Sequence, residues 1–241
     1  MIRMNEGWLL RVYAAQQEDV PKRVERVAAM AEQIGLNRGP IVALVPSDKD
    51  CGQTADALRD QVKSVIVLEC PGSPNTDVLN QGLQTLANLG CSHAVIASNK
   101  AIEAVTPRTM FTIERAVNAG ACVAGVAFDE FATGVQEGMI LNTFAVWDLG
   151  MATKFGGFVT EHPTKGGCEE ISLLAKFCRE VRDPFIAVIK DPKVVAQVMN
   201  TTEAQERFAK ILTSKVSRQD DLLKHEGITR EQIKAAVISQ M

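Results

Sequence analysis

The sequence lacks several features that would assign it to a special class of protein. Aromatic residues make up only 5% of its 241 residues, and none of its 6 cysteines belongs to a Cys-x-x-Cys pair. The content of 46% hydrophobic and 23% charged residues is that of an ordinary globular protein, which excludes the disordered, collagen-like and fibrous classes. One large domain, or one domain with a small appendage, is expected at this length.

The chain also lacks an excess of charge of one sign. It has 26 Lys and Arg against 29 Asp and Glu, so its formal net charge is −3. A protein that holds a nucleic acid backbone needs a strong positive field, which this composition does not provide. We therefore expect no nucleic acid partner.

No hydrophobic run is long enough for a membrane helix. The longest uncharged apolar stretch, Ala119 to Phe128, is far short of the roughly 20 residues that such a helix needs. Near the N-terminus, Arg11 interrupts the Trp8-Leu9-Leu10 patch, so no signal-peptide hydrophobic region forms. The scattered cysteines indicate reduced, mostly buried thiols. We expect a cytoplasmic protein with no membrane span.

Strand and helix patterns alternate through the first half of the chain. A capped amphipathic helix over 20–34 precedes what we expect to be the first strand, and short apolar runs predict strands over 41–45, 65–68, 94–97 and 121–128. Helical stretches separate these strands, among them one capped by Thr106 with Pro107 at its first position. This alternation predicts the α/β class: a mainly parallel sheet with helices on both faces.

The second half is less regular. We expect a strand over 139–147, a helix over 169–181 and a last strand over 185–189. From Thr201 onward the pattern is helical, and Thr229 with Gln232 forms a capping box that would open a final helix. The chain thus divides into an α/β domain over residues 1–200 and a C-terminal helical extension over residues 201–241. The apolar stripes of the extension either pack back on the sheet or join subunits of a homo-oligomer.

Several common catalytic motifs are missing, including the G-x-x-x-x-G-K-[ST] loop, G-x-G-x-x-G after the first strand and the G-x-S-x-G elbow. The 3 histidines have no metal-binding spacing, so a structural zinc site is not expected. In an open parallel sheet, ligands bind outside the carboxyl ends of the strands. The candidate site is therefore the set of turns over 46–48, 69–73, 98–100 and 129–130, although turns are generally polar without binding anything.

Several short motifs follow one another in a characteristic order: Pro46 at a strand end, Gly72-Ser73 after the next strand, Asn80-Gln81-Gly82-Leu83 on the following helix, and Ser98-Asn99-Lys100. This order resembles the nucleotide-binding half of the inverting family-two glycosyltransferases. The later Gly156-Gly157-Phe158, followed by Glu169-Glu170, is similar to that family's acceptor half, where a Gly-Gly-Phe turn precedes an acidic pair. The resemblance covers roughly residues 41 to 181.

This resemblance implies a GT-A type fold that binds a nucleotide-diphosphate sugar and transfers the sugar to a hydroxyl acceptor. It implies nucleotide contacts at Pro46, Ser47, Glu69, Asn80, Ser98 and Lys100. It also implies a catalytic base at Glu169 or Glu170, since a carboxylate can take the proton that the acceptor hydroxyl loses. The alternative for this pair is two acids that simply favour the first turn of a helix.

One motif departs from that family. Its Asp-x-Asp sequence holds a divalent metal, whereas this chain has Ser98-Asn99-Lys100 at that place, with no carboxylate at the outer positions. We expect Lys100 to supply positive charge to the diphosphate instead of a metal. Two functions stay open: a metal-independent glycosyltransferase, and a catalytically inactive GT-A-like binding or assembly module. A nucleotidyltransferase would need a glycine-rich basic loop after the first strand, and residues 46–50 do not supply one.

Overall fold

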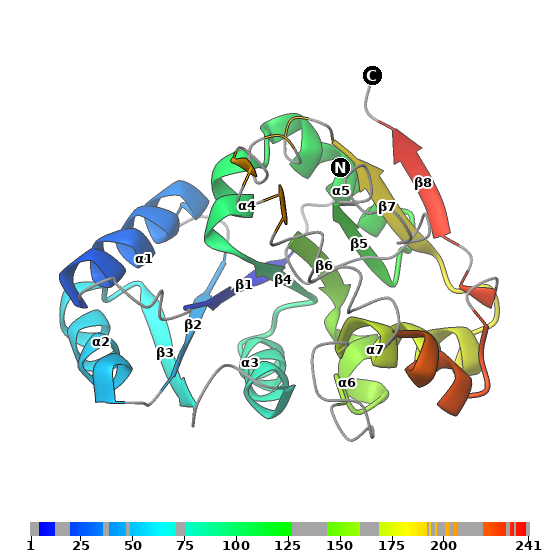
Figure 1. Cartoon of the computed structure of the whole chain (residues 1–241), viewed down its shortest axis with the longest axis horizontal. Coiled ribbons are helices and arrows are strands. Elements are labelled where there is room, and N and C mark those ends of the chain that lie inside the picture. The colour runs from blue at the N-terminus through cyan, green and yellow to red at the C-terminus, as the bar shows by residue number, and fades with distance from the viewer. Residues whose placement is uncertain are drawn as a thin grey trace.

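The chain forms one mixed sheet with helices on both faces (Figure 1). The computed structural model describes residues 5–12, 20–35, 39–46, 49–70, 76–126, 144–159, 169–191, 193, 196, 201–202, 205–206, 219–229, 232–233 and 235–239. The strands are β1 (Glu6–Arg11), β2 (Ile41–Pro46), β3 (Val65–Cys70), β4 (His93–Ala97), β5 (Val123–Val126), β6 (Phe144–Asp148), β7 (Ile186–Lys190) and β8 (Ala235–Ser239). The helices are α1 (Val20–Ile34), α2 (Lys49–Gln61), α3 (Thr76–Asn88), α4 (Asn99–Ala104), α5 (Pro107–Asn118), α6 (Leu149–Lys154) and α7 (Glu169–Glu180).

The eight strands lie in the order β3-β2-β1-β4-β6-β5-β7-β8. Strand β6 runs antiparallel to its neighbours β4 and β5, and the other described pairs are parallel. In the first half, Leu10 is paired with both Ala43 and Ala97, and Pro46 is paired with Cys70. Strands β3, β2, β1 and β4 therefore end along one edge of the sheet, which is where open parallel sheets bind ligands.

Strand β1 corrects the expected strand order. Ile41–Pro46 is the second strand, because Glu6–Arg11 already forms a strand between β2 and β4. The apolar centre of β1 is short, and the charged residues Glu6 and Arg11 flank it, so the local pattern does not indicate a strand. In the folded protein even Glu6 is buried. Burial on both faces comes from the neighbouring strands and helices rather than from the length of the apolar run.

The other elements predicted for the first half are present with small shifts at their ends. Helix α5 begins as predicted: the Thr106 hydroxyl accepts a hydrogen bond from the Thr109 amide, and Pro107 takes the first helical position. The strand expected over 121–128 is confirmed as β5, and the one expected over 139–147 begins in the described residues at Phe144, as β6. Helices α4 and α6, each of 6 residues, were not predicted.

Two hydrophobic clusters lie on opposite faces of the sheet. Helices α1, α2, α4 and α5 cover one face, and α3, α6 and α7 cover the other (Figure 1). Strand β1 serves both, since Trp8 and Leu10 belong to the first cluster and Leu9 to the second. This alternation is the period of two that a strand imposes on its side chains.

The described C-terminal residues return to the same domain. Residues 219–225 are helical, and Leu222 and Leu223 belong to the second cluster. The final helix predicted after Thr229 is wrong. The Thr229 amide does donate to Gln232 Oε1 at 2.7 Å, but this contact holds only a short turn before the chain enters β8. Strand β8 pairs with β7 because that edge offers backbone hydrogen bonds, which a capping pattern cannot reveal.

Two further expectations can be compared with the structure. Cys70, Cys91 and Cys122 are buried thiols outside any disulfide and Cys178 is a half-buried one, as predicted for the cysteines that the structure describes. Within the described residues, no helix combines the length and the apolar character needed to cross a membrane.

Candidate functional site

The predicted nucleotide contacts divide between two places in the fold. Pro46 is the last residue of β2, and Ser98 directly follows β4, so both lie at the carboxyl edge of the sheet with β1 between their strands. Lys100 is the second residue of α4. Ser47 lies outside the described residues. The parallel order of β2, β1 and β4 is what brings Pro46, Ser98 and Lys100 to one edge.

Strand β4 passes into α4 with no intervening loop. Ser98 is the N-cap residue of α4 and has an extended backbone, with φ −91° and ψ 156°. Its carbonyl oxygen accepts hydrogen bonds from the amides of Ala101 at 3.1 Å and Ile102 at 3.0 Å. Since Ala101 and Ile102 are buried in the first cluster, the sheet and the core fix the backbone that carries Ser98 and Lys100.

The residues after β4 do not fit a divalent metal. Ser98 offers a hydroxyl, Asn99 a carboxamide and Lys100 an ammonium group that has no lone pair to donate. Magnesium and manganese sites are built from carboxylate oxygens. Among the described residues of the whole chain, no group of three or more His, Cys, Asp or Glu side chains could hold a metal ion. The three residues that stand in place of Asp-x-Asp therefore supply no carboxylate to such a metal.

Glu69 pairs with Val45 at the carboxyl end of β3, beside Pro46 at the end of β2. It is in the edge strand β3, which comes third in the chain rather than second, and its carboxylate forms an ion pair with Arg59 of α2. This ion pair raises the pKa of Arg59 above its ordinary value. Both side chains are largely exposed, so the pair contributes little to stability. The structure thus places Glu69 at the carboxyl edge of the sheet near Pro46, with its carboxylate bound to Arg59 of α2.

Asn80 joins two motifs that are far apart in the sequence. From α3, its Nδ2 donates to the Phe158 carbonyl at 2.9 Å, and its Oδ1 accepts from the Phe158 amide at 2.9 Å. This pair of bonds fastens the Gly156-Gly157-Phe158 turn to α3. Gly82, two residues after Asn80 in α3, packs closely against Leu9 of β1, where a Cβ would lie 2.9 Å from a leucine methyl.

The Gly-Gly-Phe turn ends helix α6. Gly156 and Gly157 have φ of 77° and 70°, and their amides donate to the carbonyls of Thr153 at 3.1 Å and Ala152 at 2.8 Å. Glycine is needed here because residues with side chains rarely adopt this left-handed conformation. At Gly157 there is also no room, since a Cβ would overlap Oδ1 of Asn80.

Helix α7 holds the same turn from the other side. Lys176 Nζ donates to the Phe155 carbonyl at 2.9 Å, and the Val159 amide donates to Ser172 Oγ at 3.0 Å. Burial lowers the pKa of Lys176 below its ordinary value. Phe158 packs edge-on against Trp147, with ring centroids 5.2 Å apart. Sequence reasoning missed Ser172 and Lys176, although their four-residue spacing places them on one face of a helix.

The acidic pair opens α7, so the turn and the pair are parts of one assembly. Glu169 is the first residue of the helix and Glu170 the second. Glu170 exposes only 1% of its surface. A base must reach a substrate hydroxyl, and a carboxylate this deeply covered contacts protein atoms in the present conformation. Glu170 is therefore not exposed to an acceptor in this conformation.

His93 lies away from the candidate site. It opens β4 at the amino edge of the sheet, opposite the candidate site, and its Nδ1 lies 2.8 Å from Ser92 Oγ. Burial lowers the pKa of His93 below its ordinary value of 6.5, and the nearby Asp148 carboxylate opposes that shift.

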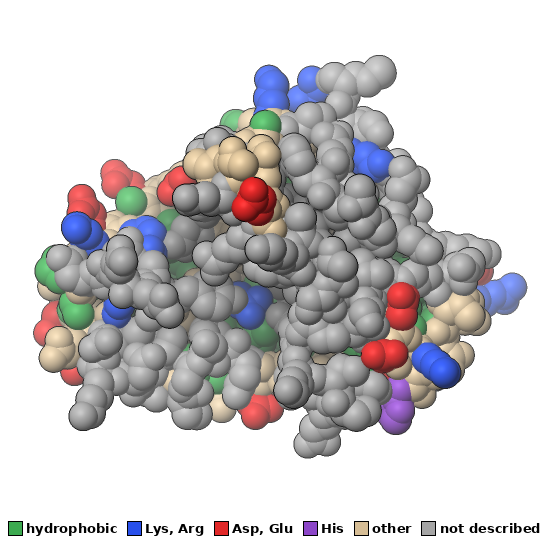
Figure 2. Space-filling view, in the orientation of Figure 1, with side chains coloured by type: hydrophobic (Ala, Val, Ile, Leu, Met, Phe, Trp, Pro, Cys, Tyr) green, Lys and Arg blue, Asp and Glu red, His purple; other side chains and the backbone are tan. Residues whose placement is uncertain are grey.

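Charges of both signs are mixed on the face of the molecule seen in Figure 2. On the described part of the face seen in Figure 2, Lys and Arg side chains are interspersed with Asp and Glu rather than gathered into one basic field. This distribution agrees with the near-neutral composition of the chain.

Comparisons with known proteins place the chain by its fold. No family model matches the sequence, and no curated protein matches it. Among solved structures, it is similar to a mannosyltransferase from Pyrobaculum calidifontis in complex with GDP-mannose and Mn²⁺, with a TM-score of 0.51 at 13% identity over 94% of this chain and 74% of that one. It is also similar to 4-diphosphocytidyl-2C-methyl-D-erythritol synthase from Anaerococcus prevotii, with a TM-score of 0.50 at 12% identity over 87% of this chain and 99% of that one. The chain thus has a GT-A-like fold, the nucleotide-diphospho-sugar transferase-like arrangement of a mainly parallel sheet between helical layers.

Proposed function

We propose that this protein is a glycosyltransferase that binds a nucleotide-diphosphate sugar and transfers the sugar to a hydroxyl acceptor without an Asp-x-Asp metal site. The observation that carries the proposal is the bond pair between Asn80 and Phe158. It joins α3, which follows β2 and β3, to the Gly-Gly-Phe turn that precedes the acidic pair. The residues assigned to the nucleotide half and those assigned to the acceptor half are therefore in direct contact. A donor site that lies beside an acceptor site requires such a contact.

Each group has a definite task in this proposal. Lys100 neutralises the diphosphate as it leaves, which a positive side chain can do in place of a metal. Glu169 takes the proton of the acceptor hydroxyl while the oxygen of that hydroxyl attacks the anomeric carbon of the donor sugar. Asn80, Lys176 and Ser172 are positioning residues that hold the turn and the start of α7.

Two other functions compete with this proposal. A catalytically inactive binding or assembly module is favoured by the lack of carboxylates after β4 and by the burial of Glu170. A nucleotidyltransferase is disfavoured even with the corrected strand order, because residues 12–19, which follow the true first strand, contain neither glycine nor a basic residue.

The first experiment is a binding screen of nucleotide diphosphates and nucleotide sugars by thermal shift, each with and without Mg²⁺ or Mn²⁺. A ligand that binds only the folded state raises its apparent stability. We expect one nucleotide family to bind without metal and Lys100→Ala to weaken that binding about tenfold. Lys63→Ala is the matched control, since Lys63 precedes β3 at the opposite edge of the sheet and should leave binding unchanged. A folded protein that binds none of these ligands would favour the assembly module.

The second experiment separates chemistry from binding with the donor found in the screen. Glu169→Gln removes the proposed base, so we expect at least about a hundredfold loss of transfer with donor binding intact. Glu170→Gln tests the other member of the pair. The control is Glu180→Gln at the far end of α7, where the glutamate is exposed and paired with Arg179. Equal transfer by all three variants would exclude the acidic pair as the base.

A further inference from the structure

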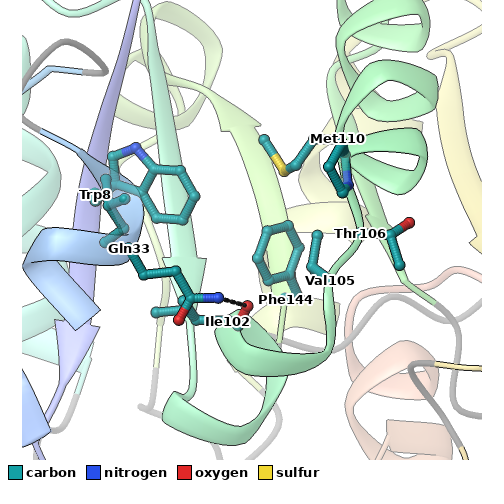
Figure 3. A pocket seen from close by; sticks show the side chains of 9 residues that line it. Trp8, Gln33, Ile102, Val105, Thr106, Met110 and Phe144 are labelled. Atoms are coloured by element: carbon teal, nitrogen blue, oxygen red, sulfur yellow. Dashed lines mark hydrogen bonds between the residues drawn. The ribbon is translucent and has the colours of Figure 1, made fainter. Parts of the chain in front are cut away.

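Two features of the described structure lie outside the proposed site: a pocket and an edge strand of the sheet. The pocket, of about 230 Å³, lies between α1 and α5, and Trp8 and Phe144 are among the residues that line it (Figure 3). Gln33 Nε2 in its wall donates to the Ile102 carbonyl at 3.0 Å, so this polar group already has a partner within the protein. The lining mixes apolar and polar groups and favours no single class of ligand. The edge strand carries a more specific pattern.

Strand β3 is the outermost strand beside β2 (Figure 1), and β2 is its one partner in the described part of the chain. In a parallel pair, alternate residues of a strand direct their N–H and C=O groups away from the neighbour. The pairing runs without a break from Val65 opposite Ile41 to Cys70 opposite Pro46, so no bulge disrupts the strand. Strand β3 also contains no proline. Its outer side can therefore pair with another strand.

The side chains of β3 are less covered than those of an inner strand. All four residues of β5 are buried, whereas Ile66 exposes 38% of its surface and Val67 and Leu68 are half-buried. Together with the open backbone groups, these three apolar residues form a strip that a further strand would remove from water.

Opposite charges flank this strip. Lys63 lies in the turn that enters β3 and Glu69 lies near the end of the strand; both are exposed, and each is three positions from Ile66. Within the chain, Lys63 Nζ donates to the Arg59 carbonyl at 2.8 Å, and Glu69 pairs with the Arg59 guanidinium. An ammonium group has three donors and a carboxylate has several lone pairs, so both groups can take a further partner. The strand is thus complementary in charge to a second copy of itself that runs in the opposite direction.

We propose that β3 joins two copies of this chain, paired antiparallel about a two-fold axis at Ile66. In this register Ile66 lies opposite the partner's Ile66, and Lys63 of each copy lies beside the partner's Glu69. A register displaced by two residues would place Glu69 beside Val65 or Gln61 instead, so the charges select the register. The arrangement closes as a dimer, whereas pairing of β3 with β8 of another copy would build an open chain of molecules. The dimer does not depend on the proposed transferase activity.

Sedimentation velocity of the full chain without nucleotide, from about 1 to about 200 μM, tests the proposal. We expect a monomer–dimer equilibrium with a dissociation constant on the order of 10 μM. Ile66→Lys would bring two like charges together at the axis, so it should weaken the dimer at least about tenfold. The control is Phe111→Lys on α5, where the phenylalanine exposes 45% of its surface. It should change the dissociation constant less than about twofold, and circular dichroism checks that both variants fold.

Reversal of the flanking charges tests the register. Lys63→Glu places a carboxylate beside the partner's Glu69, so we expect the dimer to weaken about tenfold. Lys63→Glu combined with Glu69→Lys restores opposite charges and should return the dissociation constant to within about threefold of the parent value. Lys224→Glu makes the same change in net charge as Lys63→Glu, at an exposed lysine of the helix over 219–225, and should leave the dimer intact.

Any of four results would overturn the proposal. These are a monomer at every concentration, which would leave the edge for a strand of another protein; a dimer that Ile66→Lys does not weaken; growth beyond the dimer; and a double charge reversal that fails to restore pairing. If Ile66→Lys does not fold, the charge variants at the two exposed positions decide. The readout is the mass of the assembly, so failure of the nucleotide screen would leave this result unchanged.

Discussion

Gly157 shows how closely single residues determine the candidate site. Its φ of 70° and the position of Asn80 Oδ1 both require the absence of a side chain. We expect Gly157→Ala to lower the free energy of unfolding by about 2–4 kcal/mol, from backbone strain together with overlap. Urea denaturation followed by circular dichroism measures the change.

Gly227 provides the matched control. It has a φ of 69°, but a Cβ there would meet nothing within 4 Å, so Gly227→Ala should show the strain alone, about 1–2 kcal/mol. When Asn80→Ala is the common background, the two glycine substitutions should cost the same. A persistent difference would mean that Asn80 is not the group that excludes a side chain at Gly157.

His93 predicts a pH dependence of stability. Its pKa in the folded protein lies below 6.5 because burial disfavours the charged ring, while the unfolded chain titrates near 6.5. The unfolded state therefore binds more protons between these two values, so stability should fall as the pH drops below about 6.5. Urea denaturation at a series of pH values tests this. His93→Gln should flatten the curve in that window, and an unchanged curve would contradict the assignment.

At the scale of elements, the helix over residues 219–225 acts as part of the core. Leu223 exposes 2% of its surface in the second cluster, and an Arg179–Glu226 ion pair of 2.8 Å links the end of this helix to α7. We expect Leu223→Ala to cost about 2–4 kcal/mol of unfolding free energy, the usual effect of a buried cavity. Thermal and urea denaturation both report it.

Leu89→Ala is the comparison for that substitution, because Leu89 exposes 51% of its surface after α3. Its effect should stay within about 0.5 kcal/mol. If the two leucines behaved alike, the helix over 219–225 would not pack on the domain as the structure has it.

At the scale of the whole molecule, the C-terminal residues complete the domain. Leu222, Leu223, Ile228 and Ile233 are buried in the second cluster, and β8 adds the last strand of the sheet. Deleting residues 201–241 would expose this apolar surface and leave β7 as an unprotected edge, so we expect a chain that unfolds or aggregates. Circular dichroism and gel filtration of the shortened chain test this. A folded, monodisperse product with the parent's oligomeric state would show that the extension is dispensable.

Local patterns in the sequence were sufficient for much of the fold. The apolar run at Ile41–Pro46, the Thr106-Pro107 helix start and the alternation of strands with helices are signals carried by neighbouring residues, and each predicted its element and the α/β class. Motif order assigned Asn80 to a nucleotide half and the Gly-Gly-Phe turn with the acidic pair to an acceptor half, and these roles stay predictions. The structure adds the contact between Asn80 and Phe158.

Other features depended on partners distant in the chain. Glu6–Arg11 is a strand because β2 and β4 flank it, and residues 235–239 are a strand because they pair with the edge strand β7. The hydrophobic pattern of six or fewer residues cannot reveal such distant pairing partners. The Asn80 bonds to Phe158 span 78 positions, and the Trp8–Phe144 pocket joins strands from opposite halves. Secondary-structure propensity depends on adjacent side chains, whereas strand pairing, burial and pockets arise only when the folded chain brings separate segments into contact.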